Sequence, residues 1–483
     1  MSAVADASPI SALPWSTDDP YPRQLTKNAV PRLRVGGRME IMMNFESMKE
    51  IVVRAAKAAG LDEYELFYYA DEDMGVGALK QEIDNFSSGN GQGIDFRCKV
   101  NGKMGYASTE LFTEEELTEL VSRAMENAKN IESDDEVDIF PGSPKYETIE
   151  EKPAPVPNSA QMTETALALQ SKIYSLSDKI ADGTRSSVYC SNAETCMYNS
   201  YGLELTSRVG LQYGVVSVNV KDGEEAAAGF DVAEGATMDE LGEIADKAVA
   251  EALSKLGAGL VETGHYPIVI CGKQMRSLLS TFSSVFSSRA AQKGLSLLAG
   301  KEGEKIAADC VSIVDDPFRP GSIQAAFDGE GVATSRKMVI ENGTLNTLLY
   351  NLSSAKKAGR ESTGNGARHN GIRYFNFYLA AGDATEEELL KKADGGIYIT
   401  EIKGLHAGAN ATTGDFSIES AGFMIEDGKL GRPVKSFTIA GNFFDLLKQI
   451  DTIANEVKFG LSGGPTMFGS PDVYIPNMSV AGK

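Results

Sequence analysis

The hydrophobic pattern at the start of the chain predicts a helix, three strands and a second helix. Apolar side chains recur at helical spacing over residues 45–59, and the run ends at Gly60, as expected for a helix that stops at a glycine. The second helix follows Thr113 and Glu116, which have the spacing of a capping box. Between the helices, apolar and polar residues alternate as in antiparallel strands over residues 64–69, 76–86 and 94–100.

Two of these strands are joined by residues 89–93, Gly-Asn-Gly-Gln-Gly. The glycine spacing invites comparison with a phosphate-binding loop. Such a loop opens a helix, whereas here a strand follows, so the nucleotide-binding interpretation fails. We expect these residues to be a connection between strands.

The same order of elements is repeated after an acidic, proline-rich segment at residues 131–157, which is typical of a linker or a draped loop. A helix is predicted over residues 161–180, and a last helix opens on a second capping box at Thr237 and ends at Gly257. The strands between them are predicted over residues 187–190, 194–199, 203–220 and 226–230. Helix, strands and helix on both sides of the proline-rich segment indicate a duplicated α+β unit.

The chain after residue 264 is rich in predicted strands. It opens with a buried strand at residues 266–271 and a helix over residues 275–298. We therefore predict an α+β protein with a disordered tail over residues 1–43, an N-terminal domain over residues 44–260 and a β-rich C-terminal domain over residues 261–483. In the N-terminal domain, helices should pack on a mixed or antiparallel sheet.

Three polar runs punctuated by glycine lie in the C-terminal half, at residues 327–332, 340–343 and 362–369. Glycine lets the backbone come close to a ligand, a strand or a partner chain. Asn342 and Gly343 favour a hairpin turn, whereas for the last run a structural turn and a binding loop are equal alternatives. A groove for substrate would be lined by the polar side chains of the first and last runs: Asp328, Glu330, Thr363, Asn365, Arg368 and His369.

The charge balance argues against nucleic acid as a partner. The chain has 46 Lys and Arg residues against 68 Asp and Glu residues, a net charge of −22, which repels a phosphate backbone. The only basic cluster, Arg32, Arg34 and Arg38, lies in the stretch that we expect to be a disordered tail.

Hydrophobic content and cysteine usage predict a soluble cytoplasmic protein. Hydrophobic residues make up 42% of the chain and charged residues 24%, which are ordinary globular values. No apolar run approaches the roughly 20 residues that span a bilayer, and the start of the chain lacks the apolar core of a signal peptide. The five cysteines are odd in number and widely spread, which indicates a reducing compartment.

A series of short motifs occurs in one order along the second half of the chain, at residues 327–332, 362–364, 400–401, 413–416, 421–423, 433–434, 439–442 and 479–482. As a set, these motifs resemble the TldD/PmbA family, whose members are called modulators of DNA gyrase, and its PmbA/TldE branch in particular. The resemblance covers roughly residues 45–483.

The resemblance implies peptide hydrolysis. The TldD branch is a zinc peptidase that carries His-Glu-x-x-x-His on a helix after the first strand of the C-terminal domain, with a late cysteine as a further ligand. TldD-type and PmbA/TldE-type chains resemble the two halves of a heterodimeric peptidase that trims unfolded or precursor peptides.

This chain departs from the TldD pattern where the metal would be bound. Alignment of the motif on the helix places Ser280, Thr281 and Val285 at the positions of the two histidines and the glutamate. Hydroxyls and a valine do not hold Zn²⁺ as imidazole does, and none of them serves as a general base. The late cysteine is absent, and no histidine is followed by glutamate. We therefore expect no catalytic residue and no metal in this chain, with zinc in a TldD-type partner.

Two other hypotheses stay open. One is a self-sufficient hydrolase that uses a metal or a carboxylate pair from Asp328, Glu330 and Asp415. A serine nucleophile at Ser462 in Gly-Leu-Ser-Gly-Gly is disfavoured, because Pro465 stands where a helix should begin. The other is a non-enzymatic protein that binds gyrase or another protein. A homodimer in the absence of the partner is also compatible with the sequence.

Overall fold

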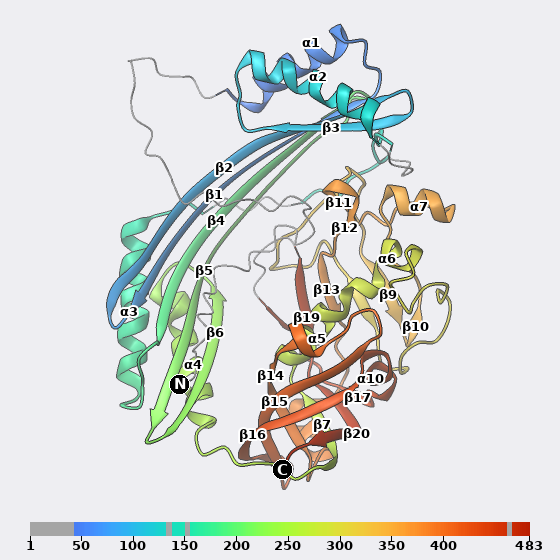
Figure 1. The fold of residues 1–483 in the computed structure, drawn as a ribbon. Helices are drawn as coiled ribbons and strands as arrows, with labels where there is room; N and C mark the ends of the chain where they lie inside the picture. Colours follow the sequence, from blue (N-terminus) through green and yellow to red (C-terminus); the bar gives the residue numbers. More distant parts are fainter. Residues whose placement is uncertain (1–42, 132–137, 150–154, 461–465) are drawn as a thin grey trace.

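The computed structural model of the chain describes residues 43–131, 138–149, 155–460 and 466–483. All but the last residue of the tail expected over residues 1–43, and part of the proline-rich segment, lie outside the described residues. The N-terminal region is a long curved sheet with helices, and the C-terminal region is a β-rich body beside it (Figure 1). This is the α+β architecture that the hydrophobic pattern predicts.

The N-terminal region consists of two units with the same order of elements. The first comprises α1 (Phe45–Ala58), β1 (Tyr64–Leu79), β2 (Glu82–Val100), β3 (Lys103–Thr109) and α2 (Glu114–Asn130). The second comprises α3 (Ser159–Leu176), β4 (Arg185–Asn199), β5 (Glu204–Asp222), β6 (Glu225–Glu234) and α4 (Met238–Ser254). The strands form one antiparallel sheet in the order β3-β2-β1-β4-β5-β6. Because β1 and β4 meet at its centre, the units are related by an approximate two-fold axis, which confirms the predicted duplication.

All four of these helices pack on one face of the sheet. Leu66 of β1 belongs to the core formed with α1 and α2, and Val76 of β1 belongs to the core formed with α3 and α4. An even number of residues separates Leu66 from Val76, so both point to the same face of the strand. The two helix pairs cover opposite ends of this face (Figure 1). The other face carries Glu65 and turns toward the C-terminal region.

A glycine on each outer strand lets a helix lie directly on the sheet. A Cβ on Gly105 of β3 would lie 1.9 Å from the Ala124 carbonyl oxygen of α2. A Cβ on Gly229 of β6 would lie 2.0 Å from the Ala248 carbonyl oxygen of α4. The same close contact therefore recurs at equivalent places in the two units, where only glycine leaves enough room.

Two predictions for the first unit are wrong. The strand predicted over residues 76–86 is interrupted, because the chain turns at Lys80 and Gln81, whose φ angles are 52° and 63°. The connection predicted at residues 89–93 is instead part of β2. A Cβ on Gly93 would lie 2.4 Å from the Tyr69 hydroxyl oxygen of the neighbouring strand. Glycine here makes room for a side chain that crosses the strand, and does not mark a bend.

The C-terminal region packs two six-stranded sheets around one hydrophobic core. The first sheet contains, in spatial order, β10 (Thr344–Leu345), β9 (Lys337–Glu341), β8 (Ile313–Asp315), β13 (Asn376–Leu379), β19 (Met467–Ser470) and β18 (Lys458–Phe459). The second contains β16 (Lys429–Asn442), β15 (Asp415–Glu426), β14 (Ile397–Lys403), β7 (Gly264–Ile270), β20 (Val473–Ala481) and β17 (Thr452–Ile453), with an additional pairing between β16 and β20.

Short elements connect these strands. They are α5 (Gly272–Phe282), α6 (Ser288–Gln292), α7 (Leu352–Ala358), α8 (Glu386–Lys392), α9 (Leu405–Gly408), α10 (Phe443–Gln449) and the strand pair β11 (Gly366–Ala367) and β12 (Gly371–Ile372). Phe282 of α5 stacks on Phe443 of α10 with ring centroids 4.6 Å apart, which fixes α5 in the core. The hairpin turn predicted at Asn342 and Gly343 is confirmed between β9 and β10, with φ angles of 48° and 80°.

The single helix predicted over residues 275–298 is wrong. α5 ends at Phe282, a 3-10 turn follows over Ser283–Phe286, and α6 begins at Ser288. Ser287 has extended backbone angles, and its hydroxyl accepts a hydrogen bond from the Ala290 amide as the N-cap of α6. Serine hydroxyls compete with backbone groups for hydrogen bonds, so a run of serines favours helix ends over helix continuation.

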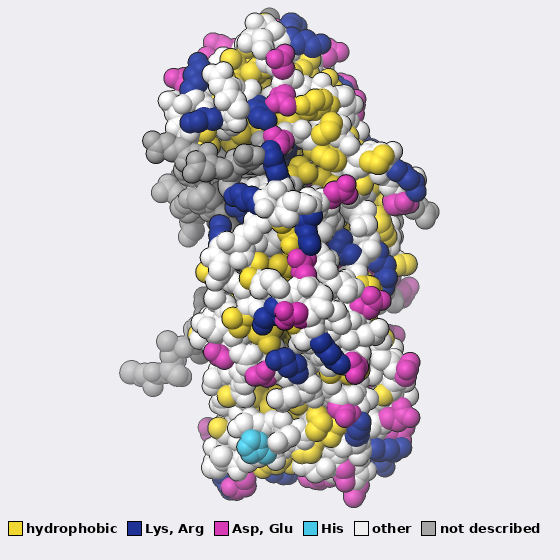
Figure 2. Space-filling view, turned by 90° about the vertical axis from the view of Figure 1, so that its right-hand side faces the viewer, with side chains coloured by type: hydrophobic (Ala, Val, Ile, Leu, Met, Phe, Trp, Pro, Cys, Tyr) yellow, Lys and Arg dark blue, Asp and Glu magenta, His cyan; other side chains and the backbone are white. Residues whose placement is uncertain are grey.

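The surface mixes charges of both signs. On the face shown in Figure 2, Lys and Arg side chains are interspersed with Asp and Glu side chains and do not form one basic field. None of the helices in the described part of the chain is long and apolar enough to cross a membrane.

The close helix contacts predict a sharp difference between two glycine substitutions. Gly105→Ala should lower the thermal midpoint by several degrees, because overpacking a well-filled contact costs about 1–3 kcal/mol and the obstacle is helix backbone. Gly89→Ala in the same sheet should leave the midpoint within about one degree, because nothing lies within 4 Å of its Cβ position. Thermal unfolding followed by circular dichroism measures both. Equal midpoints for the two variants would contradict the close packing of α2.

Candidate functional site

The two polar runs that the sequence singles out meet where the C-terminal region contacts the N-terminal sheet. Residues 327–332 lie in the loop between β8 and β9, and residues 362–369 run from the end of α7 through β11. The Gly329 amide donates to the Gly366 carbonyl at 2.7 Å and joins the runs. A Cβ on Gly329 would lie 2.8 Å from the Arg368 amide nitrogen, so this junction requires glycine.

Asp328 holds both runs together. One carboxylate oxygen accepts from the Glu330 and Val332 amides at 2.9 and 3.0 Å, and the other accepts from the Gly366 amide at 2.6 Å. The side chain is buried, with 1% of the residue exposed. Burial raises the pKa of Asp328 to about 6, although the three amide donors oppose this shift. Both oxygens are therefore engaged in shaping the loop.

Glu330 lies beside Asp328 and is also buried. Its carboxylate accepts from the Leu352 amide at the start of α7 at 2.8 Å. Burial, followed by the negative charge of Asp328, raises the pKa of Glu330 to about 7. Two adjacent buried carboxyl groups with raised pKa values are the kind of pair that can exchange a proton near neutral pH.

Arg368 links the C-terminal region to the N-terminal sheet. Its guanidinium lies 2.5 Å from the carboxylate of Glu65 on β1, and Arg97 on β2 lies 2.8 Å from the same carboxylate. We call Glu65, Arg97 and Arg368 the junction cluster. The Arg368 guanidinium also stacks on the Phe67 ring at 4.3 Å. Burial alone would raise the pKa of Glu65, but the charges of Arg97 and Arg368 outweigh it and lower the pKa.

The other three candidate residues differ in exposure. The Asn365 amide is buried and donates to Asp315 at 2.7 Å and to the Arg373 carbonyl at 2.8 Å. The Thr363 hydroxyl accepts from the Tyr350 amide at 2.8 Å and donates to Asn365 at 2.7 Å. His369 is exposed and has a left-handed backbone, with φ of 59°. The structure thus brings Asp328, Glu330 and Arg368 together, and substrate binding by the six residues stays a prediction.

Residues 138–149 of the proline-rich segment form a draped loop without helix or strand. The Tyr146 hydroxyl donates to the Gly331 carbonyl at 2.7 Å, and the Ser143 hydroxyl accepts from the Ala333 amide at 2.9 Å. Asp138 pairs with Lys99 of β2 and with Lys356 of α7. This segment therefore fastens the candidate loop to both regions.

The positions where the TldD pattern carries its metal motif do not fit zinc. Ser280 is exposed at the end of α5, and the Thr281 hydroxyl donates to the Ser277 carbonyl at 2.8 Å. Val285 lies beyond the helix and is fully buried in the core. None of these side chains offers an imidazole, thiolate or carboxylate ligand. Among the described residues, no group of three or more His, Cys, Asp and Glu side chains is arranged to hold a metal ion.

The three carboxylates considered from the sequence, Asp328, Glu330 and Asp415, do not form one cluster. Asp328 and Glu330 are neighbours, whereas Asp415 is exposed at the start of β15, where Asn442 donates to it at 2.9 Å. Ser462 lies outside the described residues.

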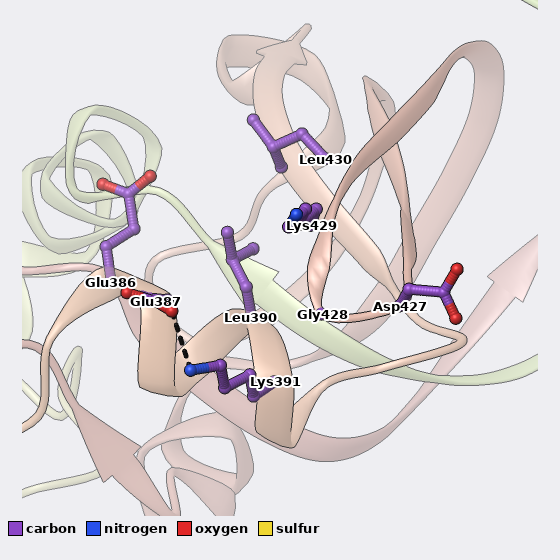
Figure 3. A pocket seen from close by; sticks show the side chains of 8 residues that line it. All are labelled: Glu386, Glu387, Leu390, Lys391, Asp427, Gly428, Lys429 and Leu430. Carbon is purple, nitrogen blue, oxygen red and sulfur yellow. Dashed lines mark ion pairs between the residues drawn. The ribbon is translucent and has the colours of Figure 1, made fainter.

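Two surface hollows lie away from the six candidate residues. A hollow of about 320 Å³ separates α8 from the turn between β15 and β16, and the Glu387–Lys391 ion pair borders it (Figure 3). A second hollow, of about 200 Å³, lies between α4 and the start of α5 and is lined by Cys271, Tyr398 and Thr400 among others. Neither is lined by Asp328, Glu330 or Arg368.

The raised pKa of Glu330 predicts a pH dependence of stability. Because the folded state holds this proton more tightly than the unfolded state does, the stabilising contribution is complete below about pH 4.5 and is lost as the pH rises through about 7. Between pH 5 and 8, wild type should lose about 2–3 kcal/mol relative to Glu330→Gln, which has no such proton. Thermal midpoints across this range measure the difference. Parallel curves for the two proteins would contradict it.

The junction cluster predicts a large cost for removing its central charge. Glu65→Gln leaves two arginines without their buried counter-ion, which should cost about 3–5 kcal/mol. A matched control is Glu204→Gln, which removes a surface ion pair with Lys49. The Glu204 side chain is 52% exposed, so its loss should cost less than about 1 kcal/mol. Equal denaturant midpoints for the two variants would show that the cluster adds no net stability.

Comparison with known proteins places most of the described chain in one family. Three family models match in order along the chain: PmbA/TldA metallopeptidase domain 1 at residues 64–128, the central domain at residues 148–256 and the C-terminal domain at residues 263–482. The first two matches fall on the two units of the N-terminal region.

Relatives and solved structures support the same family. A metalloprotease from Methanothermobacter thermautotrophicus is 28% identical, over 83% of this chain and 91% of the relative. A PmbA homolog from Haemophilus influenzae, described as a metalloprotease, is 26% identical over 80% of this chain and 86% of the relative. A Thermotoga maritima structure, described as a modulator of a DNA gyrase, has a TM-score of 0.82 and 28% identity, over 91% of this chain and all of that chain. The chain belongs to the PmbA/TldD metallopeptidase family.

Proposed function

We propose that this chain is a PmbA/TldE-type subunit of a cytoplasmic metallopeptidase and that it does not itself cut peptides. Its partner is a TldD-type chain that holds the zinc ion, and the pair trims unfolded or precursor peptides. Family membership supports peptide hydrolysis as the activity of the assembly. The fold of a TldE structure from Thermococcus kodakarensis, with a TM-score of 0.79 at 24% identity over 90% of this chain and 99% of that chain, is compatible with the branch.

The observation that carries the proposal is the chemistry of α5 and the turn after it. A catalytic zinc site needs three protein ligands and a group that takes a proton from the bound water. Ser280 and Thr281 present neutral hydroxyls, and Val285 presents a hydrocarbon to the core. These positions supply neither the ligands nor the base.

The six candidate residues contribute by shaping the junction in this proposal. Asp328 and Glu330 hold the loop at residues 327–332, and Arg368 fixes that loop against the sheet. An ordered junction of this kind presents backbone and side-chain groups to a peptide or to the partner in one fixed arrangement. Ordering them before binding reduces the entropy that binding must overcome.

Mixing experiments test the division of labour. The isolated chain should leave a fluorescently labelled unfolded casein uncut, and adding it to a TldD-type subunit should raise the cleavage rate at least tenfold over that subunit alone. Size-exclusion chromatography should show a complex, with zinc following the TldD-type subunit. Because Ser280 and Thr281 have no catalytic role in this proposal, Ser280→Ala with Thr281→Ala should leave the rate of the mixture unchanged.

The second candidate function is a self-sufficient hydrolase that uses Glu330. The observation in its favour is the pKa of about 7 that burial gives this carboxyl group, which suits a general acid or base at neutral pH. Casein cleavage by the isolated chain that is lost in Glu330→Gln would favour this function and contradict the first. Cleavage lost only with a chelator would indicate a metal site in this chain and would also contradict the first.

A further inference from the structure

The second surface hollow lies at a further contact between the N-terminal and C-terminal regions. Beside it, Lys255 of α4 pairs with Glu401 of β14 at 3.4 Å. Glu251 of α4 pairs with Lys273 of α5 at 3.5 Å, so two ion pairs cross from one region to the other. We call this hollow the seam hollow. Its volume of about 200 Å³ exceeds the roughly 150 Å³ that hold a benzene ring. The seam hollow is therefore large enough for one amino-acid side chain.

Part of the lining of the seam hollow is apolar. Tyr398 of β14 lies directly opposite Phe423 of β15, and both line the hollow. The Tyr398 hydroxyl donates to the buried Asp472 carboxylate at 2.8 Å, which fixes the ring in place. Cys271 also lines the hollow. Burial raises the pKa of its thiol to about 11, so the thiol is neutral at pH 7. These side chains offer an apolar surface without charge.

Three lining side chains are basic, against one acidic side chain, Glu251. Lys255 donates to Glu251 at 2.8 Å, and Lys458 donates to Asp472 at 2.9 Å, so both ammonium groups have close partners. The polar contacts of the third, Lys273, are longer: 3.2 Å to a backbone carbonyl and 3.5 Å to Glu251. An ammonium group has three donors. Lys273 therefore keeps the capacity to bind a further anion.

The start of α5 adds to the attraction for negative charge. Lys273 lies in the first turn of this helix of 11 residues, whose N-terminus carries a partial positive charge. Cys271 is the N-cap residue, and its side chain makes no capping hydrogen bond. Asp472 accepts from the Gly272 amide at 2.7 Å, so one carboxylate is already bound at this helix end. Lys273 and the helix end thus attract an anion to the same place.

Thr400 is a lining side chain whose hydroxyl is not satisfied. The pairing of β14 with β15 shifts by one residue between Ile399 and Glu401, which makes Thr400 the extra residue of a β-bulge. Its hydroxyl oxygen is buried and makes no hydrogen bond with any residue that the structure describes. Buried hydroxyls are nearly always hydrogen-bonded, so this one is an exception that a ligand would remove. Rotation about the Cα–Cβ bond exchanges the hydroxyl with the methyl group and turns the hydroxyl into the hollow.

These groups together select a ligand with two parts. An inorganic phosphate would meet Lys273 but would leave the aromatic rings uncovered. A purely apolar ligand would cover the rings but would leave the Thr400 hydroxyl without a partner. A metal cation would be repelled by the three ammonium groups. A carboxylate joined to a small apolar group meets all of these requirements.

We propose that the seam hollow binds a carboxylate joined to a small apolar group, as presented by the carboxy-terminal residue of a peptide. The carboxylate pairs with Lys273 and accepts from the Thr400 hydroxyl. The apolar side chain packs on Tyr398 and Phe423. The choice of a peptide end over a free acid of the same chemistry rests on the proposed function, and competition separates these two sources. The site itself needs neither the zinc-bearing partner nor peptidase activity.

Fluorescence polarisation with the full chain and the labelled peptide Gly-Ser-Gly-Ser-Leu tests both parts of the ligand. Binding should saturate when the carboxy terminus is free. It should weaken at least tenfold when that terminus is an amide, and at least fivefold when the last residue is glycine. Equal affinities of the acid and amide peptides, or no saturable binding of either, would overturn the proposal.

Unlabelled acetyl-leucine serves as the competitor that separates the two sources. Displacement of the peptide at equal concentrations would assign the site to a free acid, and displacement only at a large excess would assign it to a peptide end. Both outcomes support the carboxylate joined to an apolar group as the chemistry of the site.

Thr400→Val separates binding from folding. It removes a buried hydroxyl that has no partner among the described residues, so the thermal midpoint should stay the same or rise. Affinity for the free-acid peptide should fall at least fivefold. Thr400→Ser, which keeps the hydroxyl, should stay within twofold of wild type. Wild-type affinity of Thr400→Val would overturn the proposed site.

Lys273→Gln should weaken binding of the free-acid peptide at least tenfold and leave the amide peptide unchanged, because only the acid pairs with an ammonium group. Lys448→Gln on α10 is the control. It removes another ammonium group that has one acidic partner, and it should leave both affinities unchanged. Thermal midpoints verify that each variant folds. Acid-specific binding, together with a TldD-type mixture that cuts casein no faster, would reject the proposed function and keep this site, and the reverse result would reject this site alone.

Discussion

The arrangement of the two regions depends on one buried charge. Glu65 is fully buried on the sheet and meets an arginine from each region, Arg97 from β2 and Arg368 from the C-terminal loop. A buried carboxylate is tolerated only when it is paired and hydrogen-bonded. Because one of its partners comes from the other region, Glu65 ties the folding of the sheet to the placement of the loop. Asp328 and Glu330 continue this network of buried charge inside the loop.

The two-fold repeat explains why one face of the sheet carries no helices. One unit of helix, three strands and helix, used twice, builds a sheet whose helices all lie on one face. The opposite face and the ends of the strands are then free to differ between the copies. The first copy meets the C-terminal region through Glu65, and the second meets it near Gly331. Identical architecture therefore serves two different surroundings.

The sequence predicts local structure here better than contacts between distant segments. Period-two alternation identified the strands, and the Asn342–Gly343 turn followed from its residue types. The glycines of residues 89–93 led to the wrong prediction of a connection. In a sequence, a glycine that makes room for Tyr69 cannot be distinguished from one that bends the chain. Ser287 ended a helix whose apolar stripe runs on beyond it. These outcomes depend on neighbours that periodicity does not reveal.

The sequence pointed to the loop residues of the candidate site but not to the residues of the sheet that they contact. Asp328 and Glu330 stood out because they lie in a polar run punctuated by glycine, and the structure brings them together with Arg368. Glu65 and Arg97 were missed, because β1 and β2 carry several other charged side chains and the sequence does not set these two apart. Each has the pattern of a solvent-facing position, and only the pairing with Arg368, from a segment about 300 residues away in sequence, makes it buried. The one signal that could have drawn attention to Glu65 is that it is the only charged residue in the apolar run of residues 64–69.

The great length of β2 and β5 has a mechanical consequence. Each strand spans 19 residues, or about 60 Å at the usual rise of a strand. Twist accumulates along such a strand, so a change of only about 1° per residue turns one end relative to the other by about 19°. The helix pair α1 and α2 and the helix pair α3 and α4 sit at those two ends. A small change in local twist would therefore produce a large rotation of one helix pair relative to the other.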